Sequence, residues 1–236
     1  MTEKLRQPVG GLYRPQFERD NCGFGLIAHM DNQPSHWLVK TAISALMRLT
    51  HRGAIAADGK TGDGCGLLLK KPDAFLRKCA KETGIQLSAV YAVGMVFLNP
   101  DQALAEKSKA ALSAQLIEAG VNIAGWRTVP TDASACGEEA LKTMPHIEQV
   151  FVNAVDGMSE AEFNRKLFVA RRLAEKQLKD SDNYFYVPSL CAQLISYKGL
   201  VMPANLPVFY RDLQDESLAS SLCVFHQRSR ERQPVE

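Results

Sequence analysis

Apolar residues recur at helical spacing in several stretches of the chain. The clearest stripe follows a capping-box pair, Ser159 and Glu162, and consists of Phe163, Leu167, Ala170, Ala174 and Leu178. A second stripe predicts a helix over 37–50 that ends before Gly53, and contains Val39, Ala42, Ile43, Leu46, Met47 and Leu49. Three further helices are predicted over 72–83, 102–119 and, as a short one, 209–213. Each long helix should bury one face.

Short apolar runs between these helices predict strands. The expected strands cover 67–69, 90–98, 147–152, 184–190, 194–197 and 221–226. Helices and strands therefore alternate along the chain, and we find neither an internal repeat nor a linker that marks a second domain. The pattern indicates an α+β class.

The composition of the chain argues against nucleic-acid-binding and membrane-spanning proteins. The 236 residues are 46% hydrophobic, which is ordinary for a globular core, and carry a net charge of +2 with dispersed Lys and Arg. Nucleic acid is therefore an unexpected partner. The longest apolar run, 89–98, is about half of a bilayer span, so no membrane segment is expected. Residues 1–21 lack the apolar region of a secretory signal, and we predict a cytoplasmic protein.

Cysteine spacing gives no sign of a metal site. The six cysteines contain no Cys-x-x-Cys pair, which argues against a zinc knuckle and against a disulfide scaffold. Most of them are expected to be buried thiols. Residues 1–21 mix Pro8, Gly10, Gly11 and Pro15 with charged residues, which is typical of an extended leader. That segment is either a disordered tail or a propeptide.

Cys22 would become residue one if the leader were removed between Asn21 and Cys22. A thiol and a free α-amino group would then lie on one residue. The two groups ordinarily titrate within about one pH unit of each other, so the amine can take the thiol proton and supply a thiolate nucleophile. The alternative is that Cys22 is a small buried hydrophobe. A dinucleotide-binding role for Gly23 and Gly25 is disfavoured, because apolar residues continue the strand and no third glycine follows at the required spacing.

A second motif lies in a glycine-rich stretch. His51-Arg52-Gly53 is followed by Thr61-Gly62-Asp63-Gly64-Cys65-Gly66, and a loop of this composition lets backbone approach a ligand closely. It could also be a plain cluster of turns. Both motifs together resemble the glutaminase domain of the glutamate synthase large subunit, a class II glutamine amidotransferase. Further matches are Tyr197-Lys198-Gly199-Leu200 and Phe225-His226-Gln227-Arg228.

This resemblance, which covers roughly 13–228, implies the fold and the site. The fold is the αββα sandwich of N-terminal nucleophile hydrolases. Cys22 matches the nucleophile that forms a thioester with glutamine, and Arg52 matches an arginine that lies beside the nucleophile and helps to hold the site. Arg228 matches the arginine that pairs with the α-carboxylate of glutamine, for which a guanidinium fork is well suited.

After Arg228 the resemblance stops. The family continues with Phe-Ser-Thr-Asn-Thr, whereas 229–236 looks like an unrelated tail, and the Asn-Gly pair of the family's oxyanion hole is absent from the sequence. We therefore expect a leader over 1–21 and a partial amidotransferase domain over 22–228, incomplete at its C-terminus. Loss of an oxyanion donor typically costs about 10² to 10³ in rate, so impaired activity is expected.

The resemblance also implies partners. The substrate is glutamine, and in the full-length family the ammonia passes to a synthase domain that carries flavin mononucleotide (FMN) and an iron–sulfur cluster and works with a small subunit. Those cofactors belong outside this region, and no cofactor is expected in this chain. The alternative function is a catalytically inactive fragment that acts at most as a binding or assembly module.

Overall fold

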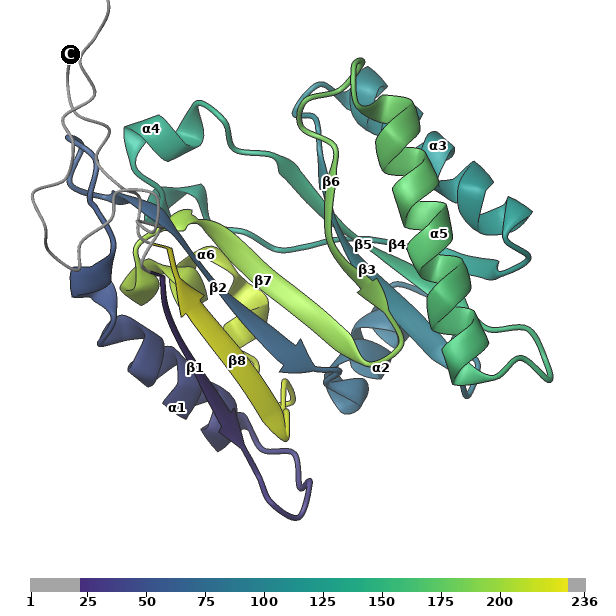
Figure 1. Cartoon of the computed structure of the whole chain (residues 1–236), viewed down its shortest axis with the longest axis horizontal. Coiled ribbons are helices and arrows are strands. Elements are labelled where there is room, and N and C mark those ends of the chain that lie inside the picture. The colour runs from purple at the N-terminus through teal and green to yellow at the C-terminus, as the bar shows by residue number, and fades with distance from the viewer. Residues whose placement is uncertain (1–21, 229–236) are drawn as a thin grey trace, which may run out of the picture.

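The computed structural model describes residues 22–228, apart from the side chain of Arg52. The expected leader (1–21), with Asn21, and the expected tail (229–236) lie outside the described residues. Within 22–228 the strands form two four-stranded antiparallel sheets, and helices pack on both (Figure 1). The predicted α+β class is confirmed, and the two sheets with helices on each agree with a fold of the N-terminal nucleophile hydrolase type.

The first sheet has the strand order β1-β8-β2-β7. It consists of β1 (Gly23–Ala28), β2 (Thr61–Lys70), β7 (Leu194–Val201) and β8 (Leu222–Gln227). Strand β2 begins six residues earlier than the sequence predicts, so most of the glycine-rich motif is strand rather than loop. Glycine permits this: a Cβ at Gly66 would lie 2.8 Å from Cβ of Lys198 on the paired strand β7.

Helix α1 (His36–Met47) packs on β1 and β8. Val39, Ala42, Ile43 and Leu46 of its predicted stripe are buried, whereas Met47 is exposed. The hydroxyl of Ser35 caps the first turn by accepting a hydrogen bond from the Leu38 nitrogen. The helix ends at Met47, earlier than predicted, because the Arg48 nitrogen bonds back to the carbonyls of the last turn. A separate 3₁₀ turn, η2 (Thr50–Arg52), follows. Gly53 therefore ends that turn and not the helix.

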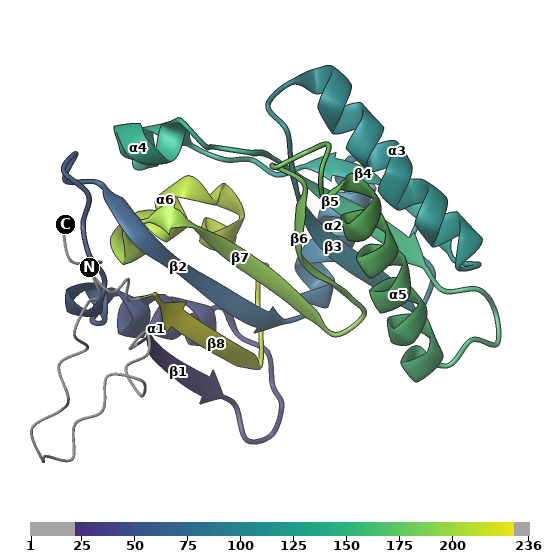
Figure 2. The ribbon, with the colours of Figure 1, turned by 45° about the horizontal axis from the view of Figure 1, so that its top comes forward.

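The second sheet has the order β4-β5-β3-β6. It consists of β3 (Tyr91–Leu98), β4 (Asn122–Thr128), β5 (His146–Asn153) and β6 (Tyr186–Cys191). Helices α3 (Gln102–Glu118) and α5 (Glu160–Leu178) lie side by side on its outer face (Figures 1 and 2). The capping hydroxyl of Ser159 and the buried stripe of α5 are as predicted. Strand β4 was not predicted, because its half-buried residues do not alternate.

One hydrophobic core joins the two sheets. It contains residues of β2, β7 and β8 together with residues of β3 and β5. Short elements fill the space around this core: α2 (Asp73–Glu82), η3 (Ala133–Ala135), α4 (Glu138–Leu141), η4 (Pro203–Asn205), α6 (Leu206–Phe209) and η5 (Arg211–Gln214). Arg127 of β4 crosses the junction and donates two hydrogen bonds to the buried carboxylate of Asp212, at 2.9 and 2.8 Å. The second sheet is therefore fixed to the first by packing, and a buried ion pair fixes β4 to η5.

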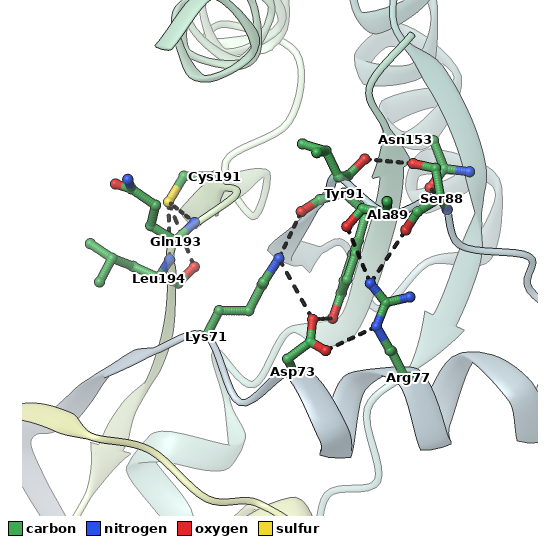
Figure 3. A network of polar contacts seen from close by, with 11 residues as sticks. Lys71, Asp73, Arg77, Ser88, Ala89, Tyr91, Asn153, Cys191, Gln193 and Leu194 are labelled. Atoms are coloured by element: carbon green, nitrogen blue, oxygen red, sulfur yellow. Dashed lines mark hydrogen bonds and ion pairs between the residues drawn. The ribbon is translucent and has the colours of Figure 1, made fainter. Parts of the chain in front are cut away.

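A network of polar contacts links the end of β2, the helix α2 and the start of β3 (Figure 3). The hydroxyl of Tyr91 donates to the Asp73 carboxylate at 2.9 Å, and the same carboxylate accepts a 2.9 Å hydrogen bond from Arg77. Lys71, directly after β2, donates to the Tyr91 carbonyl at 3.0 Å. The ammonium of Lys71 also lies 3.8 Å from the centre of the Tyr91 ring. These contacts anchor the start of α2 to β3.

The first sheet has one open face. Odd-numbered residues of β2 and β8 point into the core, so even-numbered residues point to the other side, since side chains alternate along a strand. On that side Phe24 is 78% exposed and Leu26 is 60% exposed. We use the term open face for this surface, which carries Phe24, Leu26, Leu68, Lys198, Leu200, Val224 and His226.

Candidate active site

Cys22 lies at one end of the first sheet. It is exposed and directly precedes β1. Strand β1 runs antiparallel to β8, with Gly23 opposite Gln227. Cys22 is one residue beyond Gly23 and Arg228 is one residue beyond Gln227, so the expected nucleophile and the expected carboxylate-binding arginine lie at the same end of this strand pair.

Gly25 of the first motif is required by packing in a strand. A Cβ at Gly25 would overlap the ring of Phe225 on β8. Strand β1 continues through Ala28, and the next helix begins only at His36. A glycine-rich turn that opens directly into a helix is therefore absent from this segment, as expected from the sequence.

The second motif packs against the same end of β8. A Cβ at Gly53 would overlap the amide nitrogen Nε2 of Gln227 and would lie 3.3 Å from the Arg228 carbonyl. The carboxylate of Asp63 fixes Ala54, the residue after Gly53, by accepting a 2.7 Å hydrogen bond from its backbone nitrogen. The His51-Arg52-Gly53 segment therefore lies beside Gln227, within one residue of Arg228.

A carboxylate organises the loop between these motifs. Asp58 accepts hydrogen bonds from the Thr61 hydroxyl at 2.5 Å, from the Thr61 nitrogen at 2.8 Å and from the Glu139 nitrogen at 3.0 Å. These bonds, above all the one from the Thr61 hydroxyl, hold the pKa of the Asp58 carboxyl well below its usual range. The loop after Gly53 is thereby fastened to the first turn of α4.

The third segment of the site is the start of β2. The backbone nitrogen of Arg228 donates a 2.9 Å hydrogen bond to the carbonyl of Gly64. Gly64 has a φ of 116°, a value that favours glycine. Cys65 pairs with Gln227, and burial raises the pKa of its thiol to about 12. This thiol is therefore unsuited to be the nucleophile near neutral pH.

A cavity of about 790 Å³ opens beside Arg228, and most of its lining is apolar. Its polar end is formed by Asp63, Gly64, Lys198, His226 and Arg228. Burial, followed by the charges of Arg228 and Lys198, lowers the pKa of His226. His226 is then neutral over a wider pH range, and the positive charge at this end comes from Lys198 and Arg228. Such an end suits a carboxylate ligand.

The structure places Cys22 and Arg228 at the same end of the paired strands β1 and β8, and the backbone of Arg52 directly precedes Gly53, which packs against Gln227. What the Arg52 side chain contacts lies outside the described residues. Sequence reasoning missed Gln227 and Asp58. Gln227 stands within a recognised motif, next to Arg228, and could have been noticed there, whereas the contacts of Asp58 to α4 have no local signal.

No group of three His, Cys, Asp or Glu residues that could hold a metal ion occurs within 22–228. None of the helices in the same range has the length and apolar character needed to traverse a bilayer.

Comparison with known proteins gives consistent matches. The family model for class-II glutamine amidotransferases matches residues 22–232. The chain is 40% identical over 229 residues to the glutamate synthase [NADPH] large chain of Bacillus subtilis (strain 168), and the match covers 97% of this chain and 15% of that relative. It is 39% identical over 223 residues to the glutamate synthase [NADPH] large chain of Azospirillum brasilense, and this match covers 93% of this chain and 15% of that relative.

A plant protein is similar to nearly the same degree. The ferredoxin-dependent glutamate synthase, chloroplastic, of Spinacia oleracea is 37% identical over 231 residues, and the match covers 96% of this chain and 14% of that relative. The chain thus spans about 15% of the length of the curated relatives that it matches.

Proposed function

Because the chain belongs to the class-II glutamine amidotransferases, we propose that it carries the glutamine-hydrolysing part of a glutamate synthase large chain. The observation that carries this proposal is the convergence of Cys22, the Gly53 loop and Arg228 at one end of the first sheet. In this proposal Cys22 is the nucleophile, Arg52 helps to hold the site and Arg228 binds the α-carboxylate of glutamine.

The proposed reaction begins with cleavage between Asn21 and Cys22. The freed α-amino group takes the proton from the Cys22 thiol, and the thiolate attacks the side-chain carbonyl carbon of glutamine. The C–N bond of the amide then breaks, the proton on the amine passes to the leaving nitrogen, and ammonia departs. Water hydrolyses the resulting thioester to glutamate and the free thiol.

The wider context is also a proposal. The synthase domain, the small subunit, FMN and the iron–sulfur cluster belong in this view to regions outside 22–228. We also propose a leader over 1–21, a domain over 22–228 and a tail over 229–236, and a location in the cytoplasm. The relatives are named as glutamate synthases, which supports the proposal that this chain is part of such an enzyme.

The test is ammonia release from glutamine by the purified chain, with Cys22→Ser as the control. Glutamine-dependent ammonia that disappears in Cys22→Ser supports the proposal. The second candidate, a catalytically inactive binding or assembly module, is favoured by the uncovered apolar side chains of the open face. Release of ammonia at the same rate by both chains, or by neither, would favour that candidate.

A further inference from the structure

Gln227 presents an unexplained polar group at the centre of the candidate site. The residue is 1% exposed. Its amide nitrogen donates a long, 3.4 Å hydrogen bond to the Arg228 carbonyl, but its amide oxygen Oε1 has no hydrogen-bond partner among the residues that the structure describes. A buried acceptor left unpaired costs about 1 to 3 kcal/mol, and native structures seldom keep one without a reason.

The surroundings of this amide come from every segment of the site. Gln227 lies in β8, between Gly23 of β1 on one side and Cys65 of β2 on the other. Gly53 packs directly against its side chain. The Gln227 amide lies next to the backbone of Gly53, and the backbone of Gln227 pairs with Gly23 of the first motif. The backbone nitrogen of Cys22, the residue before Gly23, lies at the same end of this strand pair.

We propose that Oε1 of Gln227 accepts a hydrogen bond from the α-amino group of Cys22 once the leader has been removed. In the uncleaved chain this nitrogen belongs to a peptide bond and has a single N–H. Cleavage turns it into an amine with additional donors at the same place in the fold. The inference rests on the proposed function, and it assigns Gln227 the part of a positioning residue rather than a catalytic one.

This hydrogen bond would serve the proton transfer. When the thiol proton moves from Sγ to the amine, an ammonium with three donors forms, and a fixed carbonyl oxygen stabilises that charged state. A glutamine amide suits this role because it accepts a hydrogen bond without being able to take the proton itself. The amine would also be held on one side of Cys22, with the thiol left free to reach glutamine.

The experiment compares chains that differ in the Cys22 nitrogen. One chain begins at Cys22, released from a cleavable fusion, and the other has one alanine added before Cys22, which makes the nitrogen an amide. Each is prepared with Gln227, with Gln227→Met, which removes the acceptor at similar volume, and with Gln227→Glu, which keeps it. The rate of Cys22 alkylation by iodoacetamide is followed by peptide mapping from pH 6 to pH 9.

We expect Gln227→Met to slow alkylation at pH 7 by about 3- to 10-fold in the free-amine chain, because a 10-fold change corresponds to about 1.4 kcal/mol, which is the size of one net hydrogen bond. Gln227→Glu should retain the parent rate or exceed it. Neither change should alter the rate in the alanine-extended chain. Gln149→Met replaces a buried glutamine in β5 of the second sheet and should leave Cys22 unaffected in both chains.

Equal rates for the parent and Gln227→Met in the free-amine chain would overturn the inference. So would an equal slowing in both chains, because that is what a purely structural role predicts. Circular dichroism checks that each variant is folded. If Gln227→Met does not fold, the alkylation rate of Gln227→Glu is compared with that of the parent in both chains. The proposed function fails separately, when a folded, free-amine parent chain releases no glutamine-dependent ammonia.

Discussion

The backbone nitrogen of Arg228 donates a 2.9 Å hydrogen bond to the carbonyl oxygen of Gly64. This bond fixes the residue after β8 against the glycine-rich start of β2. On its other side β8 pairs with β1, directly after Cys22. The candidate site is therefore made by pairing of strands that are far apart in the sequence, and it depends on the first sheet being assembled.

Removal of the leader is the first expectation to test. Within the proposed mechanism Cys22 needs a free α-amino group, so the mature protein should lack residues 1–21. Intact-mass analysis of purified protein should show a species that begins at Cys22. Protein that keeps the leader and nevertheless hydrolyses glutamine would show that the base is another group.

Cys22 should be the first of the six cysteines to react with a glutamine-like electrophile such as a diazoketone. Cys22 is exposed, whereas burial raises the pKa of Cys65 and Cys223 to about 12 and that of Cys79 to about 11. Thiolate is the reacting form, so these three should be slower. Peptide mapping after partial reaction measures the order, and initial labelling of Cys79 would contradict the assignment.

Gly53→Ala should impair both stability and the site. The added methyl group would overlap the Gln227 amide, and overpacking of a buried place typically costs about 1 to 3 kcal/mol. Ammonia release should fall together with the midpoint of urea unfolding. Gly199→Ala is a matched control, because its Cβ would have an ordinary 3.8 Å contact with Val201. Equal effects of the two substitutions would show that the contact with Gln227 is unimportant.

Much of the fold could be predicted because it has a local cause. The Ser159 cap and the apolar stripe of α5 are fixed by neighbours three or four residues away. The buried run of β3 likewise shows its strand directly in the sequence. The placement of Cys22 and Arg228 at one end of the first sheet depends on the pairing of β1 with β8, which has no local signature in the sequence.

The failures have a common physical origin. The segment from Thr61 to Gly66 looks like a loop because of its glycines, yet it is strand because those glycines let β7 approach. Strand β4 has no alternation, and its Gly125 is explained by contact with Ile85, which lies between α2 and β3. The unpaired Oε1 of Gln227 is also set by non-local packing. Partners distant in the chain decide each of these cases.

Asp212→Ala should strongly destabilise the protein. The Asp212 carboxylate is buried and pairs with both terminal nitrogens of Arg127. Its removal leaves a largely buried guanidinium without its charged partner, which typically costs about 3 to 5 kcal/mol. Glu139→Ala breaks an exposed pair with Lys142 and should change the unfolding free energy by less than about 1 kcal/mol. Urea titrations of both variants measure the difference, and similar losses would contradict the distinction.

The open face should promote association between molecules. Phe24 and Leu26 are 78% and 60% exposed and lie on β1, which is an edge strand of the first sheet. Exposed apolar side chains on a strand edge favour association between molecules. Threonine retains the preference for strand without the apolar surface, so the double variant Phe24→Thr, Leu26→Thr should stay soluble at higher concentration with little change in unfolding free energy. Phe225→Thr, on the buried side of β8, should instead lose stability. Light scattering against concentration provides the measurement, and unchanged aggregation of the double variant would show that association uses another surface.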